Sequence, residues 1–424
     1  METGQDSVHD RTRITLDEED RDKVVLESTS SAGRRLRLSR SEDGNYSVDS
    51  TRLLVPIQTY SVEEGQPRRT TSLAVSPDQS QIGIGLLDGA AYLYPVVEPK
   101  PSPKYPIPET PDSRDSRQTL VEIQGRKTAH KSTVTALQFF PSSRVLLSAG
   151  ADFTMRIWPA EPTPPPSVST PIPARTLIAH TRPITSIAIN PLDRGRTVLS
   201  AGADGTVRLW NVSSGSEDSE RRIRHGGSGV TGITLDSEAK LLYCALQDGS
   251  FEVFRVDLSS NNPHPVSALN PTERIFASTR SIGGALTCIA LGPSTNVNVK
   301  PLLATGSQGG IISLYLADEA EDFRHLLSFK RNGATIEALS FLPQHLPAQP
   351  ASLGLAIATG DGLPWIAGIN MESPSDATGG TEINVSTYAE LTGGEIDAVR
   401  GVVSVGNEIW TACDDGLVRR YFVG

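Results

Sequence analysis

Cysteine is scarce in this chain, which has only three in 424 residues: Cys244, Cys288 and Cys413. An odd number of widely spaced thiols argues against a disulfide framework and does not match the ligand spacing of a zinc site. We therefore expect buried free thiols in a reducing compartment. No stretch approaches 18 consecutive apolar residues, and residues 1–6 show neither a basic segment nor an apolar run. The sequence predicts neither a membrane span nor a secretory signal.

Basic residues are too few for a protein whose main partner is a nucleic acid. The chain has 39 Lys and Arg against 49 Asp and Glu, a net charge of −10, whereas phosphate binding requires a clustered basic face. The acidic balance fits a surface that meets a basic protein partner. With 37% hydrophobic residues, the chain is long enough for one large all-β domain and an extension.

Catalytic motifs are also missing, because the sequence has no HExxH, GxSxG or P-loop. Three of the seven histidines, His130, His180 and His225, precede turn aspartates at nearly equal spacing and are explained by a repeat. His264, His325 and His345 lie in or near insertions without Asp, Glu or Cys at ligand spacing, and His9 lies in the acidic start of the chain. We expect no catalytic residue, no metal and no cofactor.

The stretch from His180 to Trp210 shows what is present instead. Alternating apolar residues predict two half-buried strands, and Asp204-Gly205 predicts a tight turn before a third strand. We expect Asp204 to accept from His180, His180 to contact Ser200, and Ser200 to reach the Trp210 indole. His130, Ser148, Asp152 and Trp158 have the same spacing and predict a second structural tetrad.

This pattern resembles a WD repeat. Units with two apolar strands, a glycine-bearing turn and a third strand recur seven times, although the fifth has Gly309 at the usual aspartate position and the sixth lacks the usual aromatic. Insertions rich in Pro, Ser, Asn or Gly separate the strands and are expected at the surface. They are Pro95–Arg117, Pro159–Pro173, Asp257–Pro271, Pro343–Ser352 and Met371–Thr381.

The resemblance implies an all-β fold, a seven-bladed WD40 β-propeller with a small N-terminal β-rich extension. We expect residues 1–50 to form an acidic, partly disordered extension and residues 51–424 to form the propeller. The last unit has only three strands, so we predict that residues 53–62 supply its outer strand and close the ring. Closure removes exposed sheet edges.

Two stretches carry a narrower resemblance. Residues 139–152 and the Asp193-Arg194-Gly195-Arg196 turn before Trp210 resemble the proteasomal ATPase-associated factor family, whose members are WD-repeat assembly chaperones of the 19S regulatory particle. The resemblance implies a non-enzymatic monomer that binds the C-terminal domain of a proteasomal ATPase subunit until the base assembles. It further implies a location in the cytoplasm and nucleus, and no partner that is a nucleic acid or a membrane.

The partner-binding residues are predicted from geometry alone. Residues just before the turn aspartate, or at the start of an inner strand, should line one face of the disc. Four residues meet this description and are mostly acidic: Gln247, Glu337, Glu395 and Asp414.

Two other functions stay open. A substrate receptor of a ubiquitin ligase is the alternative, although the blade endings Trp158-Pro159 and Trp210-Asn211 lack the Trp-Asp-x-Arg ending of such receptors. A propeller enzyme would need a metal-binding ring of carboxylates and histidines at the central channel, and the repeat already uses the histidines.

Overall fold

The structure is a computed structural model in which every assigned element is a β-strand. It describes residues 12–16, 24–28, 34–40, 46–61, 68–98, 117–122, 128–161, 171–212, 220–256, 258, 273–293, 301–317, 323–346, 349–372, 382–394 and 396–423. For residues before 51 only the strands are described. Among the described residues, no helix is long and apolar enough to cross a membrane.

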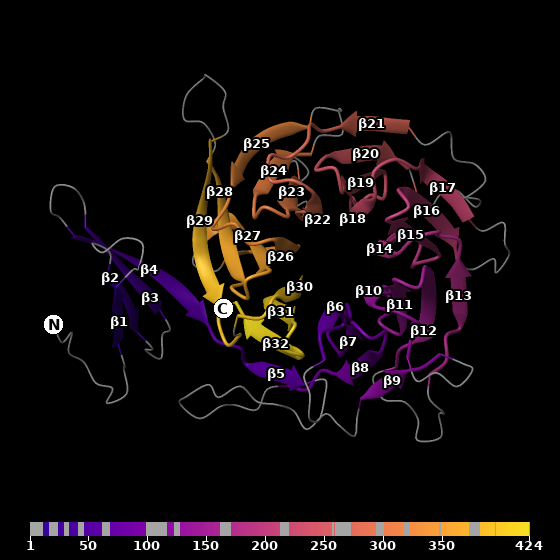
Figure 1. Ribbon diagram of the computed structural model, residues 1–424, viewed down its shortest axis with the longest axis horizontal. Helices are drawn as coiled ribbons and strands as arrows, with labels where there is room; N and C mark the ends of the chain where they lie inside the picture. Colours follow the sequence, from indigo (N-terminus) through magenta and orange to yellow (C-terminus); the bar gives the residue numbers. More distant parts are fainter. Residues whose placement is uncertain are drawn as a thin grey trace.

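Seven antiparallel sheets stand around a central axis and form the blades of a propeller (Figure 1). This confirms the predicted all-β, seven-bladed fold. Blades 1 to 3 are β6–β9 (Thr70–Val75, Gln81–Leu86, Ala91–Pro95, Gln118–Leu120), β10–β13 (Val134–Phe139, Val145–Gly150, Thr154–Pro159, Arg175–Ile178) and β14–β17 (Ile184–Ile189, Thr197–Gly202, Thr206–Asn211, Glu220–His225). Blades 4 and 5 are β18–β21 (Val230–Leu235, Leu241–Leu246, Phe251–Arg255, Glu273–Ala277) and β22–β25 (Leu286–Leu291, Leu302–Ser307, Ile312–Leu316, Arg324–Phe329).

Blades 6 and 7 contain the parts of the chain that are furthest apart in sequence. Blade 6 is β26–β29 (Ile336–Leu346, Gln349–Thr359, Trp365–Glu372, Glu382–Leu391), and blade 7 has β30–β32 (Val399–Val405, Glu408–Cys413, Leu417–Phe422). The fourth strand of blade 7 is β5 (Gln58–Ser61), which pairs antiparallel with β32. The early segment therefore closes the ring.

The closing strand is shorter than the predicted 53–62. Residues 53 and 54 end β4 (Tyr46–Leu54), which pairs in parallel with β29 through Leu53 and Leu54. Val62 lies outside the described residues. β4 also crosses the predicted boundary at residue 50, and β1 (Thr12–Leu16), β2 (Val24–Ser28) and β3 (Arg34–Arg40) continue the blade-6 sheet beyond it. The β-rich extension is thus an outward continuation of one blade (Figure 1).

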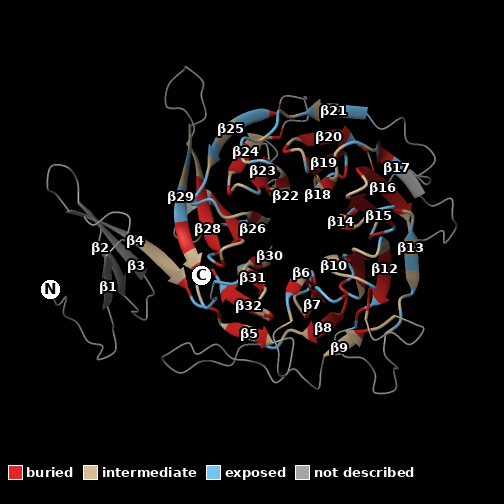
Figure 2. Ribbon diagram, viewed as in Figure 1, coloured by how far each residue is buried: buried red, intermediate tan, exposed pale blue. Residues whose placement is uncertain are grey.

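Apolar side chains fill the spaces between neighbouring blades, and the exposed positions gather on the outer strands (Figure 2). Each of the seven hydrophobic clusters of the described residues lies between two adjacent sheets. The cluster between blades 7 and 1, for example, joins Tyr60, Ile84 and Trp410. Full burial of one large apolar side chain contributes about 1.5–3 kcal/mol, so each blade is stabilised mainly by its two neighbours.

Parts of the predicted insertions are strand. β26 extends to Leu346 and β27 starts at Gln349, so both strands enter the expected Pro343–Ser352 loop. β26 accommodates Pro343 because this residue lies where the register is irregular, between Phe341 and His345. The central parts of the other insertions lie outside the described residues.

Candidate protein-docking face

One end of the disc is built from the same hydrogen bond in every blade. The backbone N–H of the residue before the turn between the second and third strands donates to a carbonyl just before the inner strand. The seven donor–acceptor pairs are Leu87–Arg69, Ala151–Thr133, Ala203–Pro183, Gln247–Gly229, Gln308–Ala285, Gly360–Thr335 and Asp414–Ala398. We call this end, with its turns and inter-blade loops, the turn face. The repeated bond brings the two loop types together and fixes the outline of a docking surface.

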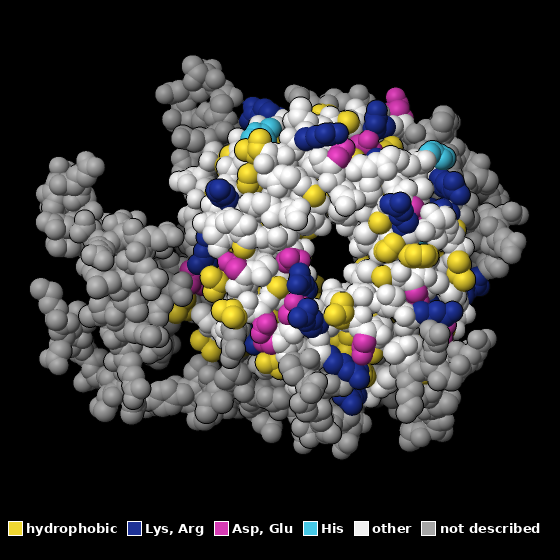
Figure 3. Space-filling view, in the orientation of Figure 1, with side chains coloured by type: hydrophobic (Ala, Val, Ile, Leu, Met, Phe, Trp, Pro, Cys, Tyr) yellow, Lys and Arg dark blue, Asp and Glu magenta, His cyan; other side chains and the backbone are white. Residues whose placement is uncertain are grey.

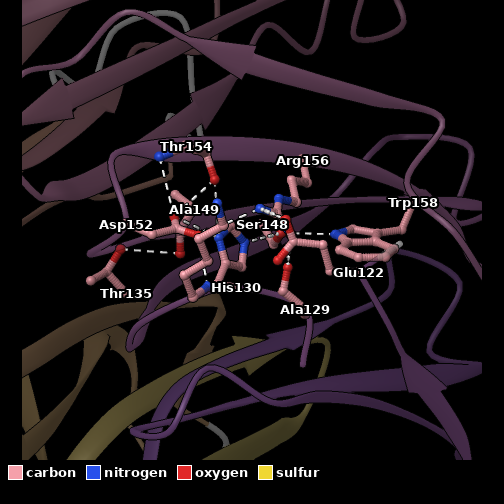
Figure 4. Close-up of polar contacts among 11 residues, drawn as sticks. Glu122, Ala129, His130, Thr135, Ser148, Ala149, Asp152, Thr154, Arg156 and Trp158 are labelled. Carbon is pink, nitrogen blue, oxygen red and sulfur yellow. Dashed lines mark hydrogen bonds and ion pairs between the residues drawn. The ribbon is translucent and has the colours of Figure 1, made fainter. Parts of the chain in front are cut away.

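The tetrad of blade 2 anchors this face to the sheet (Figure 4). Nδ1 of His130 lies 3.0 Å from Oδ1 of Asp152, and Nε2 lies 2.7 Å from Oγ of Ser148. The Trp158 indole N–H donates to the same hydroxyl at 2.8 Å. Because an ionised Asp152 only accepts, Nδ1 carries the proton and Nε2 accepts from Ser148.

Blade 3 repeats the arrangement with the residues predicted for it. His180 is 2.9 Å from Asp204 and 2.7 Å from Ser200, and the Trp210 indole donates to Ser200 at 2.9 Å. In both blades the next backbone N–H, of Lys131 or Thr181, also donates to the aspartate. The side chains of His130 and His180 and both serines are fully buried, so a substrate in solvent does not reach them.

These bonds set the charge state of the tetrads. Burial alone would raise the pKa of the Asp152 carboxyl, but hydrogen bonds from His130, Lys131 N–H and Thr154 hold it well below its usual range. Burial would likewise raise the pKa of Asp204, and donors from Thr181, Thr206 and His180 keep it low. Burial lowers the pKa of His130 despite its contact with Asp152. The tetrad therefore combines a neutral imidazole with a carboxylate.

The third predicted repeat histidine has no such role. His225 ends β17 and is exposed. The neighbouring Arg224 is buried instead, and it donates to Glu252 at 2.6 Å and to the carbonyls of Gly205 and Ser228. The interpretation of His225 as a repeat histidine was wrong, because an arginine one position earlier ties blade 4 to blade 3.

A β-bulge interrupts the register near the start of each inner strand. In blades 1 to 5 the bulged residue is a threonine: Thr71, Thr135, Thr185, Thr231 and Thr287. The hydroxyls of Thr71 and Thr185 donate to carbonyls of the next blade at 2.6 and 2.7 Å. In blades 6 and 7 the same position holds Glu337 and Arg400.

The charged pair replaces the threonine bond at the junction of blades 6 and 7. Arg400 lies 3.1 Å from Glu337 and donates to both carboxylate oxygens of Asp414, at 3.1 and 2.9 Å. The bonds to Asp414, assisted by Glu337, raise the pKa of Arg400 above its usual value. Charged side chains of both signs gather beside the central opening over β26 and β30 (Figure 3). Sequence analysis missed Arg400, whose partners lie in β26 and in the turn between β31 and β32.

The four predicted partner-binding residues have different surroundings. Gln247 is exposed on the turn face. Glu337 and Asp414 lie together, but their side chains are only 20% and 12% exposed and both are paired with Arg400. Glu395 lies outside the described residues. The structure thus brings two of the four together, at the channel mouth, where an arginine offsets part of their charge.

Cations also line the loops of this face, which was expected to be mostly acidic. Arg69, Lys131 and Arg182 are exposed just before the inner strands of blades 1 to 3. Blades 6 and 7 contribute acidic side chains. Asp397 is exposed, and its backbone carbonyl accepts from the thiol of Cys413, next to Asp414. Glu337 and Asp414 share Arg400. The turn face therefore has a basic part and an acidic part.

No group of three potential metal ligands occurs among the described residues. A cavity of about 280 Å³ lies between blades 4 and 5, next to the turn after β18, and is lined by Asp236, Tyr243, Leu291 and neighbouring residues.

Comparison with known proteins agrees with this geometry. Residues 122–159 and 172–211 match the family model described as WD domain, G-beta repeat. These segments contain the two tetrads. The chain is therefore a seven-bladed β-propeller in which blades 2 and 3 match the WD40 repeat. Its other blades keep the architecture and replace the tetrad with other contacts.

Similarity to individual WD40-repeat proteins is partial. The chain is 36% identical to human Striatin-3 over 93 residues, which is 21% of the chain and 11% of the relative. It is 28% identical to WD repeat-containing protein 18 of Bos taurus over 195 residues, 44% of the chain and 41% of the relative. Protein HIR1 of Kluyveromyces lactis is 25% identical over 201 residues, covering 46% and 22%. The chain thus spans less than half the length of these curated relatives.

Proposed function

We propose that this WD40 propeller is a non-enzymatic protein-binding scaffold that assists assembly of the proteasome 19S regulatory particle. It holds the C-terminal domain of an ATPase subunit of the base on the acidic part of its turn face. It acts as a monomer in the cytoplasm and nucleus and needs no cofactor, nucleic acid or membrane.

The observation that carries this proposal is the turn at Asp193–Arg196 together with residues 139–152, which resemble the proteasomal ATPase-associated factor family. The two stretches touch: a Cβ on Gly195 would lie 2.2 Å from Cδ1 of Phe140. Gly195 also has φ of +80°, a conformation that favours glycine. Packing of Phe140 therefore requires this glycine, so the two pieces of the signature form one unit between blades 2 and 3.

The acidic part of the turn face supports the chosen partner surface. Asp397 is exposed, and Glu337 and Asp414 line the channel mouth beside it. Complementary charge raises association rates and selects among partners, so a basic surface on the ATPase domain fits this region.

The test is capture of defined ATPase subunits from cell extract by the full chain. We expect free ATPase subunits and base precursors to be recovered, with little mature particle. Asp397→Lys should weaken recovery, because Asp397 is exposed in the acidic part of the turn face and its side chain forms no bond to another blade among the described residues. Asp414→Lys is a poorer probe, since it also breaks the Arg400 pair. Leu192→Ala, in the turn between β14 and β15, is the matched control, and recovery of no ATPase subunit by the wild type would refute the proposal.

Fluorescence imaging of the tagged full chain tests the location separately. We expect signal in the cytoplasm and nucleus, and confinement to another compartment would contradict the proposed role.

A further inference from the structure

Phe153 occupies a backbone position that glycine holds in every other blade. The residue after the turn aspartate, or after Gly309 in blade 5, has positive φ in all seven blades. Six of these residues are glycines: Gly89, Gly205, Gly249, Gly310, Gly362 and Gly416, with φ from +75° to +90°. Phe153 adopts φ of +68°, a left-handed conformation that is unfavourable for a bulky L-residue.

The ring of Phe153 belongs to none of the hydrophobic clusters of the described residues. The residue is 38% exposed. Its backbone N–H donates to the carbonyl of Gly150 at 3.2 Å, a bond that any residue at this position can form, and the side chain of Asp152 accepts from Thr154. The fold thus keeps an exposed aromatic ring in an unfavourable conformation. Strain that local packing does not explain is a reason to look for a function at that residue.

The surroundings of Phe153 are apolar and basic. Leu87, in the equivalent turn of blade 1, is 50% exposed, and Ile178, opposite Thr154 at the end of β13, is 69% exposed. The carbonyl of Leu87 accepts a hydrogen bond from the Thr133 hydroxyl. In the same loop, the backbone N–H of Lys131 donates to Asp152, the residue before Phe153. Leu87 N–H donates to the carbonyl of Arg69. These contacts join blades 1 and 2 into one continuous surface.

Cations border this surface on both sides. Arg69, Lys131 and Arg182 are exposed, and no described carboxylate forms an ion pair with them. The nearby Asp88 pairs with Arg68 at 3.5 Å, so it offsets a different cation. We call Arg69, Leu87, Lys131, Phe153, Ile178 and Arg182 the Phe153 strip. Its sign is opposite to the net charge of the chain, −10.

We propose that the Phe153 strip binds an extended segment of a partner protein that carries carboxylates next to a large apolar side chain. The apolar residue packs on Phe153 between Leu87 and Ile178, and the carboxylates pair with the bordering cations. Aromatic residues surrounded by well-packed neighbours supply much of the binding energy of protein interfaces. The strip lies over blades 1 to 3, away from the acidic channel mouth, so this inference does not depend on the proposed assembly role.

The test separates binding from folding. Phe153→Asn removes the ring and places at this position a residue that tolerates the left-handed conformation. We expect its melting temperature to equal or exceed that of the wild type. Leu192→Asn, which removes an apolar side chain of similar exposure (42%) at the turn after β14, is the matched control.

The probe is a phage-displayed library of random 12-residue peptides, selected against the full chain and counter-selected against the Phe153→Asn variant. We expect enriched peptides to combine Asp or Glu with Leu or Phe. An enriched peptide with a fluorescent label should bind Phe153→Asn and Lys131→Glu at least tenfold more weakly, bind Leu192→Asn normally, and bind the wild type more weakly as salt increases.

Three outcomes would overturn the proposal. They are no enrichment over the Phe153→Asn counter-selection, enrichment of basic or uncharged peptides, and equal affinity for wild type and Lys131→Glu. A fall in the melting temperature of Phe153→Asn would show that the ring is structural, and this too would count against the strip.

Discussion

At the scale of single residues, the two tetrads are the best-defined elements of the molecule. His180 joins Asp204 to Ser200, and Trp210 completes the chain of bonds across three strands. Buried hydrogen bonds to a charged group are each worth about 1.5–3 kcal/mol. The tetrad therefore holds the turn face and the sheet of its blade in one arrangement.

We expect His180→Ala and Asp204→Ala each to lower the free energy of unfolding by about 2–3 kcal/mol, because each leaves a buried polar partner without its bond. Urea unfolding followed by circular dichroism measures this effect. Thr181→Ala is the control, since Thr181 is exposed and only its backbone N–H bonds Asp204. Equal midpoints for the three variants would show that the tetrad carries little stability.

The charge states of the blade-2 tetrad predict how stability depends on pH. Burial lowers the pKa of His130 in the folded state. Below pH ~6.5 the unfolded chain therefore binds a proton that the folded chain does not. The free energy of unfolding decreases as the pH is lowered through this range. The pKa of Asp152 is also depressed in the folded state, and its contribution, present above pH ~4, is lost as the pH falls further. We expect the urea midpoint to decrease from pH 7 to 5 and again below pH 4. The second decrease should be smaller in Asp152→Asn, and equal slopes would contradict this assignment.

At the scale of elements, the closing strand is held by a buried polar cluster. Arg420 of β32 donates to Gln58 of β5 at 2.7 Å and to Glu408 of β31 at 2.9 Å. Its guanidinium lies 5.2 Å from the ring centre of Trp410, and Gln58 donates to the carbonyl of Val97. This cluster connects three strands of blade 7 with blade 1.

The two charges of this cluster should be energetically coupled. We expect Arg420→Met and Glu408→Gln each to destabilise the protein by about 3 kcal/mol, since a buried charge is left without its partner. The double variant should cost clearly less than the sum of the two, as coupled sites do. Urea unfolding of the three variants measures the coupling, and strictly additive effects would mean that the two side chains act independently.

Much of the fold follows from the sequence because the repeat is local. The turn Asp204-Gly205 and the alternation around it predict three strands of a blade without reference to distant residues. The parallel pairing of β4 with β29 does not follow, because it joins Leu53 to Glu390 and no local pattern marks it. For the same reason the predicted closing strand, 53–62, began too early: residues 53 and 54 pair with β29, and the closing strand is Gln58–Ser61.

The candidate site was predicted less completely than the fold. The rule that the residue before the turn aspartate lies on this face puts Gln247 and Asp414 at equivalent points, and their backbone N–H groups form equivalent hydrogen bonds. The pairing of Glu337 and Asp414 with Arg400 joins β26, β30 and the turn after β31, and no local sequence pattern marks it. Phe153 does carry a sequence signal, since it replaces the glycine that follows the aspartate in other turns.

At the scale of the whole molecule, seven hydrophobic clusters alternate with seven sheets. No blade has a core of its own, so the propeller should unfold as one body. We expect Tyr60→Ala to shift the entire calorimetric transition to lower temperature, because Tyr60 is fully buried between blades 7 and 1 and such truncations cost about 3–5 kcal/mol. An early, separate peak for one blade would contradict a single cooperative ring.

The bond between Arg420 and Gln58 spans 362 positions of the chain. During translation β5 leaves the ribosome before any strand of the ring, and its partner β32 leaves after all of them. In the nascent chain β5 therefore stays unpaired until β32 has been synthesised. Until then, the side of blade 1 that packs against blade 7 is also uncovered. We therefore expect the chain to be most prone to aggregation while it is still being synthesised, and its folding yield to depend on ribosome-associated chaperones.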